Sequence, residues 1–288
     1  MLYTEAAEKF HKHMQTCERS EKTIYGYLKD LEAFHRFYEA RNNCQCYIED
    51  IRIDDVEAFM RLLQAKGLKP ASRNRIVHAL RSFYKFLRTK GLCEVNIMEQ
   101  VASIKVPKQE RTYLTDDEVH MITKAMRNPI MRTVTYTLYY SGLRISECLN
   151  LRLQDVDFET ATIRVIGGKG GKDRLIPINH KLFDILSAYK NRYRLHATPE
   201  EAFFATLSTG SLSASYYNTY LKKVVERQLG WKKRITAHTF RHSFASSLVR
   251  NGVNLVHIQK LLGHSSLAVT SVYTHAKLAD LSEAVNVL

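Results

Sequence analysis

Hydrophobic residues recur every three or four positions through the first hundred residues, which is the spacing that lines one face of an α-helix. Residues 53–63 and 76–87 repeat this period, and Gly67 to Pro70 interrupt it. The apolar positions of the best-marked stretch are Tyr25, Leu28, Leu31, Phe34, Phe37 and Tyr38. The pattern predicts a helical domain of four or five helices over residues 1–102, with no strand.

A polar segment at 103–111 contains Pro107 and breaks the periodicity, so we expect it to be a linker. Thr115 follows shortly after it, with Glu118 three residues on, a spacing typical of a capping box at the start of a helix. A second domain is therefore expected over residues 112–288.

The second domain has a mixed pattern. Helices are expected at about 116–126, 129–140, 180–195, 213–229, 237–251 and 254–262, the last capped by Asn254 and Gly263. Residues 162–166 and 174–178 resemble strands around a glycine-rich turn and predict a β-hairpin. Apolar residues at helical spacing also predict a C-terminal helix at 277–288. The expected fold class is mostly α with a small β-hairpin.

The net charge of the chain limits the kinds of molecule that it is expected to bind. The chain carries 43 Lys and Arg against 29 Asp and Glu, a net charge of +14, which favours an anionic polymer such as nucleic acid over a membrane surface. No apolar run is long enough for a membrane-spanning helix. The five cysteines are scattered and are interpreted as free thiols, which makes the cytoplasm the expected compartment.

Basic residues concentrate in one part of the helical domain. Residues 58–93 contain no acidic residue, and Arg81, Lys85 and Arg88 share one helix face. A solvated basic face is one interpretation. The DNA interpretation is preferred because like charges on a helix face repel, and a phosphate backbone would remove that repulsion. The candidate DNA-binding residues of this helix are Arg73, Arg75, Arg81, Lys85 and Arg88.

Four short stretches of the second domain carry candidate chemistry, although each alone has a plain structural explanation. They are Gly142-Leu143-Arg144-Ile145-Ser146-Glu147, the hairpin turn with Lys169, His238-Thr239-Phe240-Arg241, and Leu262-Gly263-His264 followed by Tyr273. Arg144 and Glu147 could form a surface ion pair, and Lys169 could be an exposed turn residue. His238 and Arg241 could be ordinary polar helix positions, and Tyr273 could be a packing tyrosine.

Together these residues fit metal-free cleavage of a phosphodiester. Arg144 and Arg241 offer planar guanidiniums that match phosphate oxygens and stay protonated. Tyr273 is a candidate nucleophile, and its phenol needs help in losing a proton, from His238 or His264. A lysine on the glycine-flanked turn, Lys169, could protonate the leaving oxygen.

In these motifs the sequence closely resembles the tyrosine recombinase (phage integrase) family. Residues 112–275 match by motif, and residues 4–100 resemble more loosely the helical, SAM-like core-binding domain of that family. The resemblance assigns Arg144, Lys169, His238, Arg241 and His264 to the catalytic set and Tyr273 to the nucleophile. The turn is one glycine longer than expected, so Lys172 is an alternative to Lys169 and otherwise a candidate DNA contact.

The resemblance implies a 3′-phosphotyrosyl intermediate and a reaction that needs no cofactor, metal or ATP. It also implies a double-stranded DNA core site and a homo- or hetero-tetramer assembled on DNA, with helix 277–288 docking on a neighbouring protomer. Packing of that helix on its own domain is the alternative. The compact chain is similar to Xer-like members, which favours excision or resolution over a large integration complex.

Three rival functions remain open at this point. A DNA-binding regulator would explain the charge but not the spacing of the catalytic set. A metal-dependent nuclease could use His238, His242 and His264, but the sequence lacks a C-x-x-C and the glutamate of the zincin motif. A type IB topoisomerase would share the chemistry, and only recombination between two sites would separate the two.

Overall fold

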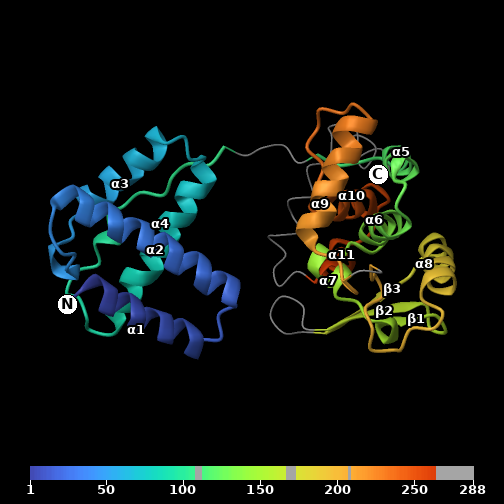
Figure 1. The fold of residues 1–288 in the computed structure, drawn as a ribbon, viewed down its shortest axis with the longest axis horizontal. Helices are drawn as coiled ribbons and strands as arrows, with labels where there is room; N and C mark the ends of the chain where they lie inside the picture. The colour runs from blue at the N-terminus through green and yellow to red at the C-terminus, as the bar shows by residue number, and fades with distance from the viewer. Residues whose placement is uncertain (108–111, 167–172, 207–208, 264–288) are drawn as a thin grey trace, which may run out of the picture. The chain divides into compact units, whose positions relative to one another are not determined.

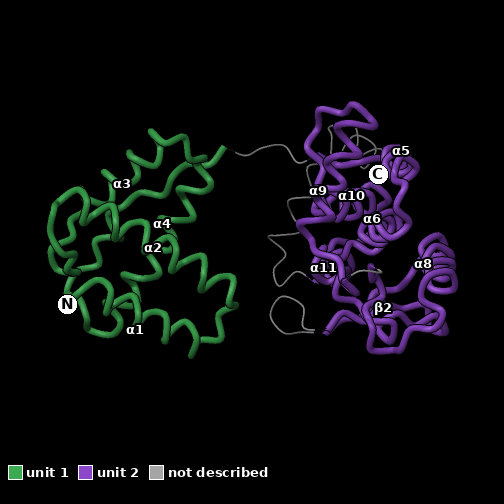
Figure 2. The backbone as a smooth tube through the Cα atoms, viewed as in Figure 1, with its two compact units in different colours: residues 1–109 green, residues 110–288 purple. Residues whose placement is uncertain are grey.

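The computed structural model describes residues 1–107, 112–166, 173–206 and 209–263. The chain forms two compact units, residues 1–109 and 110–288, coloured separately in Figure 2. Each unit has its own hydrophobic core. None of the helices in these ranges combines the length and apolarity needed to cross a membrane.

The first unit is built from α-helices and two short 3-10 turns, with no strand element in its described part (Figure 1). Its elements are α1 (Tyr3–Thr16), α2 (Glu21–Asn42), η1 (Ile48–Asp50), α3 (Ile53–Ala65), α4 (Pro70–Thr89) and η2 (Ile97–Glu99).

Helix α4 forms the centre of this unit because α1, α2, α3 and η2 all contact it. The stripe predicted from sequence, with Val77, Leu80 and Phe83 among its members, is fully buried. Phe83 also packs edge-on against Tyr3 of α1, with ring centroids 5.3 Å apart. Gly67 adopts a left-handed φ of 76°, and Pro70 occupies the first turn of α4. The break predicted between the third and fourth helices is therefore caused by Gly67, which turns the chain, and by Pro70, which starts α4.

The second unit combines helices with one small antiparallel sheet in the order β1-β2-β3. Its elements are α5 (Asp116–Ala125), α6 (Pro129–Ser141), α7 (Ile145–Leu149), η3 (Leu153–Asp155), β1 (Val156–Asp157), β2 (Thr162–Val165), β3 (Arg174–Pro177), α8 (His180–Tyr193), α9 (Ala214–Lys223), the π-helical turn η4 (Val224–Gln228), α10 (Ala237–Arg250) and α11 (Leu255–Leu262).

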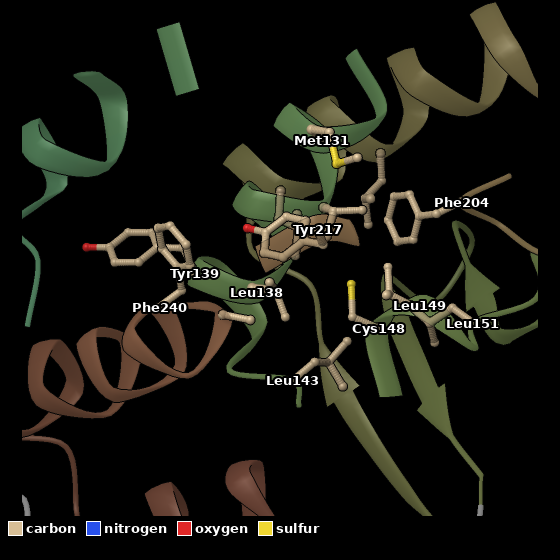
Figure 3. Close-up of a cluster of buried hydrophobic side chains, with 14 of the residues drawn as sticks. Met131, Leu138, Tyr139, Leu143, Cys148, Leu149, Leu151, Phe204, Tyr217 and Phe240 are labelled. Atoms are coloured by element: carbon tan, nitrogen blue, oxygen red, sulfur yellow. The ribbon is translucent and has the colours of Figure 1, made fainter. Parts of the chain in front are cut away.

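Helix α6 organises the core of the second unit, since α5, α7, α8 and α10 all contact it. Side chains from α6, α7, α9 and α10 gather around one apolar centre that includes Leu138, Cys148, Tyr217 and Phe240 (Figure 3). The sheet lies at one end of the unit beside α8 (Figure 1), where the rings of Phe158 and Phe183 meet 5.5 Å apart.

The expected fold class is confirmed, and most predicted elements form within a few residues of their expected ends. Thr115 and Glu118 make both hydrogen bonds of the predicted capping box. Asn254 and Gly263 cap α11 as expected, Gly263 with a φ of 62°. The sequence did not reveal β1 or α7, whose lengths of 2 and 5 residues are too short to display a period. The predicted helix 213–229 is α9 followed by the π-helical turn.

Candidate active site

The site begins at the turn between α6 and α7. Gly142 ends α6 with a left-handed φ of 65°. A Cβ atom at this position would lie 2.4 Å from the ring of Phe244 and 3.0 Å from Leu262. Only glycine therefore allows α10 and α11 to pack this closely against the turn that leads to Arg144.

Arg144 precedes the first residue of α7 and is bound to Glu147 in two ways. Its backbone N–H donates to Oε2 of Glu147 at 2.8 Å, and its Nη1 donates to Oε1 at 2.6 Å. The Arg144 side chain is 22% exposed and that of Glu147 only 8%. The interpretation of this pair as an exposed surface ion pair is therefore wrong.

Arg241 reaches the same carboxylate from α10. It is buried, and its Nη1 and Nη2 donate to the carbonyl oxygens of Gly142 at 2.5 Å and Leu262 at 2.6 Å. Its Nη1 lies 4.0 Å from Oε2 of Glu147. Two of the predicted catalytic residues, Arg144 and Arg241, are thus brought together although they are far apart in the sequence.

Sequence reasoning missed a third arginine of this cluster, Arg174 at the start of β3. Its Nη1 and Nη2 donate to Oε1 and Oε2 of Glu147 at 3.1 and 2.8 Å. Its Nε donates to the carbonyl oxygen of Leu261 at 3.2 Å. The sequence suggested Glu147 only as a partner of Arg144, but it is the shared centre of all three arginines, called here the Glu147 cluster (Arg144, Glu147, Arg174 and Arg241).

The C-terminal end of α11 completes this environment. Three consecutive carbonyl oxygens, those of Leu261, Leu262 and Gly263, accept from Arg174, Arg241 and Arg144 respectively. The carbonyl groups at a helix C-terminus carry partial negative charge and attract cations. The C-terminal end of α11 is therefore hydrogen-bonded to the Glu147 cluster. His264 follows this end directly in the sequence.

The charge state of Glu147 follows from these contacts. Burial raises the pKa of its carboxyl, but hydrogen bonds from Arg174 and from the backbone and side chain of Arg144 lower that pKa overall to about 2. Glu147 is consequently a carboxylate at neutral pH, and it offsets part of the positive charge of the three guanidiniums.

His238 lies one turn before Arg241 on α10, so both residues lie on the same side of the helix. Loss of water around the ring, followed by the charges of Arg241 and Arg144, lowers the pKa of His238 from its ordinary 6.5. A neutral imidazole beside two guanidiniums can accept a proton near neutral pH.

The remaining predicted catalytic positions cannot be placed in this cluster. Lys169, Lys172, His264 and Tyr273 lie outside the described residues, as does the predicted helix 277–288. The described part of the site therefore contains the two guanidiniums of Arg144 and Arg241, which can match phosphate oxygens, the carboxylate of Glu147 that holds them, and the neutral imidazole of His238.

The predicted DNA-binding arginines of α4 have partners within the first unit. Arg75 pairs with Asp30 and Arg88 with Glu99, the latter at 3.3 Å. Arg73 donates to Gln64 at 2.8 Å, and Arg81 donates to Ser103 at 2.7 Å and to the carbonyl oxygen of Val101. Lys85 is exposed and forms no ion pair among the described residues.

These contacts correct one premise of the sequence argument, namely that the basic charge of α4 is unrelieved. Acidic residues outside the 58–93 segment reach back to it in the folded unit. Asp30 comes from α2 and Glu99 from η2. A count of charges along the segment could not reveal them.

Both units match known protein families. Residues 112–279 match the phage integrase family, and residues 7–91 match the N-terminal SAM-like domain of phage integrases. A tyrosine recombinase of Thermosipho africanus is 33% identical over 277 residues, covering 93% of this chain and 94% of that protein. Tyrosine recombinase XerA of Pyrococcus furiosus is 33% identical over 288 residues, covering 99% and 94%.

Solved structures agree with these sequence matches. A crystal structure of XerA recombinase is similar with 26% identity and a TM-score of 0.54, covering 98% of this chain and 97% of that one. The Tn1549 transposon integrase, solved in complex with a circular intermediate DNA, has the same fold with a TM-score of 0.81 at 19% identity, covering 100% of both chains. The chain therefore belongs to the phage integrase family, the tyrosine recombinases.

Proposed function

We propose that this enzyme is a site-specific DNA recombinase that cuts and rejoins duplex DNA through a covalent bond between Tyr273 and a backbone phosphate. The reaction class follows from the family, and the assignment of roles to individual residues is our own. The observation that carries these roles is the convergence of Arg144 and Arg241 on one buried carboxylate beside a neutral His238.

In the proposed step, the phenolic oxygen of Tyr273 attacks the scissile phosphorus and the bond to the 5′-oxygen breaks. The guanidiniums of Arg144 and Arg241 stabilise the negative charge that builds on the non-bridging oxygens. His238 or His264 takes the phenolic proton, and Lys169 or Lys172 gives a proton to the leaving 5′-oxygen. One phosphate ester replaces another, so the energy of the broken bond is kept in the 3′-phosphotyrosyl link.

The free 5′-hydroxyl can then attack a phosphotyrosyl link in a second duplex, which yields excision, resolution or integration. Exchange between two duplexes needs four active sites, so we propose a homo- or hetero-tetramer assembled on double-stranded DNA. We propose that residues 1–102 hold the core site, that 103–111 connect the two domains, and that helix 277–288 docks on a neighbouring protomer. The cytoplasm is the proposed compartment.

Covalent capture tests this proposal and at the same time identifies the DNA site. The protein is incubated with a library of nicked duplexes of random sequence in EDTA, and the reaction is stopped with SDS. We expect a protein–DNA adduct that survives SDS, because the nick lets the cleaved strand diffuse away and traps the intermediate. Sequencing of the captured DNA then gives the core site.

Tyr273→Phe is the matched control, since it removes only the nucleophilic oxygen. We expect this variant to select the same DNA by binding and to form no adduct. Binding with no adduct by the unaltered protein on the selected site would support a regulator instead, and cleavage that EDTA abolishes would support a metal-dependent nuclease.

A further inference from the structure

We propose that Arg174 is a positioning residue for the reaction: its guanidinium holds the Glu147 carboxylate and the end of α11 in one geometry, which aims Arg144 and Arg241 at the phosphate. This inference rests on the proposed function, because it assigns a role within the same site.

The contacts of Arg174 differ in kind from those of a surface arginine. Its two Nη atoms face the two oxygens of Glu147 as a fork, at 3.1 and 2.8 Å. Such a bidentate pair fixes the plane of the carboxylate as well as its position. One oxygen of Glu147 is thereby directed to Nη1 of Arg144 and the other to Nη1 of Arg241.

The third nitrogen of Arg174 extends this control to α11. Nε donates to the carbonyl oxygen of Leu261, the residue before the one whose carbonyl receives Arg241. Gly263 shows how close this packing is, because a Cβ there would lie 3.1 Å from the guanidinium of Arg174. One side chain therefore joins the carboxylate to the segment that precedes His264.

Arg174 is itself held firmly. In the β2–β3 ladder it pairs with the buried Val165, and its side chain is only 12% exposed. A guanidinium with this burial and with three bonds inside the protein is poorly suited to be a general DNA contact. Its chemistry acts through Glu147 and α11.

Removing Arg174 should leave Glu147 with a different charge balance. Among the described residues, the charged groups that face Glu147 are Arg144, Arg174 and Arg241, and Asp155 and Arg164 line a small cavity with it. The hydrogen bonds of Arg174 are the strongest influence that lowers the pKa of Glu147 against burial. Without them that pKa rises, and protonation of Glu147 becomes able to disturb the two catalytic arginines in mildly acid solution.

The test uses Arg174→Gln in the full chain, with adduct formation on the captured core site. At saturating DNA we expect the cleavage rate to fall about 10- to 100-fold, by analogy with the loss of a residue that orients a metal ligand, while DNA affinity stays unchanged. We also expect a larger loss of activity toward acid pH than the unaltered protein shows, because protonation of Glu147 adds to that of His238. Arg174→Lys keeps the charge without the fork and should recover only part of the rate.

Two further variants separate positioning from folding. Arg194→Gln removes another half-buried arginine of the same unit, 15% exposed and paired with Glu201 at 2.7 Å, and should leave the cleavage rate unchanged. Glu147→Gln combined with Arg174→Gln removes the buried carboxylate that Arg174→Gln leaves with only Arg144 and Arg241 as partners, so it should fold even where Arg174→Gln does not. The double variant should also lack the added acid sensitivity. It should cleave no more slowly than the slower of the two single variants, Arg174→Gln and Glu147→Gln, the latter measured for this comparison.

The outcomes distinguish the inference from the proposed function. If the unaltered protein forms no adduct, the proposed function fails. If it forms the adduct and Arg174→Gln has the same rate and pH profile, the inference fails and the function stands. Full activity of Arg174→Lys, or additive losses in the double variant, would equally contradict the positioning role.

Discussion

Two groups of arginines in this molecule face acidic residues under very different conditions. On α4 the arginine side chains of the ion pairs are exposed, Arg75 to 53% and Arg88 to 55%; Glu99 is also exposed, to 62%, whereas Asp30 is buried. In the Glu147 cluster the side chains of Arg174 and Arg241 are 12% and 6% exposed, and the shared carboxylate is 8% exposed. An arginine–carboxylate ion pair is therefore a surface contact between Arg88 and Glu99 but part of a fixed internal framework in the Glu147 cluster.

The contrast indicates what each group can do when DNA arrives. An exposed ion pair contributes only about 0–1 kcal/mol, so a phosphate can replace the carboxylate at little cost. Breaking a buried pair by removing one partner costs about 3–5 kcal/mol. Arg88 of α4 is thus suited to binding, whereas the Glu147 cluster is organised before the substrate binds, which is what stabilisation of a transition state requires.

Substitution of the cluster arginines should have the largest effect. Arg144→Ala and Arg241→Ala should each slow adduct formation by about 10²–10³-fold, the usual cost of losing one donor to a developing oxyanion. Binding of the core site should persist, because we propose that exposed basic residues elsewhere supply most phosphate contacts. Rates measured on a nicked substrate, beside affinities from gel shift, check this. A loss of binding as large as the loss of rate would remove the distinction between the two groups.

Gly142→Ala should damage the framework itself. The left-handed φ of 65° alone costs about 1–3 kcal/mol for a non-glycine residue, and the contact with Phe244 adds about 1–3 kcal/mol of overpacking. Gly210→Ala is the matched control, since Gly210 has a φ of 64° with no atom within 4 Å of the added Cβ. Urea unfolding should therefore show a clearly larger loss of stability for Gly142→Ala than for Gly210→Ala. Equal losses would mean that the turn at Gly142 rearranges to accommodate the added methyl group.

The pH dependence of cleavage should report the environment of His238. Because the pKa of His238 lies below its ordinary 6.5, the neutral ring persists into mildly acid solution, and activity falls only as the pH drops through that lowered value. Single-turnover rates between pH 5 and 8 should show this fall below pH 6.5. His238→Gln should be slower and lose the fall. A midpoint above the ordinary value would contradict the influence of the two arginines.

The α4 surface should give the smallest effects. Lys85→Ala and Arg88→Ala should each reduce the salt dependence of DNA binding by about one unit of slope per lost phosphate contact. Glu99→Gln releases Arg88 from its ion pair and should tighten binding, by no more than about fivefold. Unchanged slopes in both alanine variants would show that this face does not meet DNA.

Much of this picture could be predicted from the sequence where the signal is local. The capping box at Thr115, the caps of α11 and the buried stripe of α4 depend on neighbouring residues, and the structure confirms them. The pairs Asp30–Arg75 and Glu99–Arg88 depend on tertiary contacts, so the charge count along residues 58–93 could not include them.

Arg174 was missed although a usable signal was present. In β3 the side chains alternate, with Ile176 buried and Leu175 exposed, so Arg174 falls on the buried side with Ile176. An arginine on the inward face of a strand needs a buried acceptor. Glu147 was the candidate, but only the fold brings β3 beside α7.

The proposed nucleophile of the reaction, which the Glu147 cluster serves, is the phenolic oxygen of Tyr273. Proteolysis of the captured adduct, followed by mass spectrometry of the DNA-linked peptide, identifies the residue that is joined to DNA. We expect a phosphodiester on Tyr273 joined to the 3′ end of the cleaved strand. A link to any other residue, or to the 5′ end, would contradict this expectation.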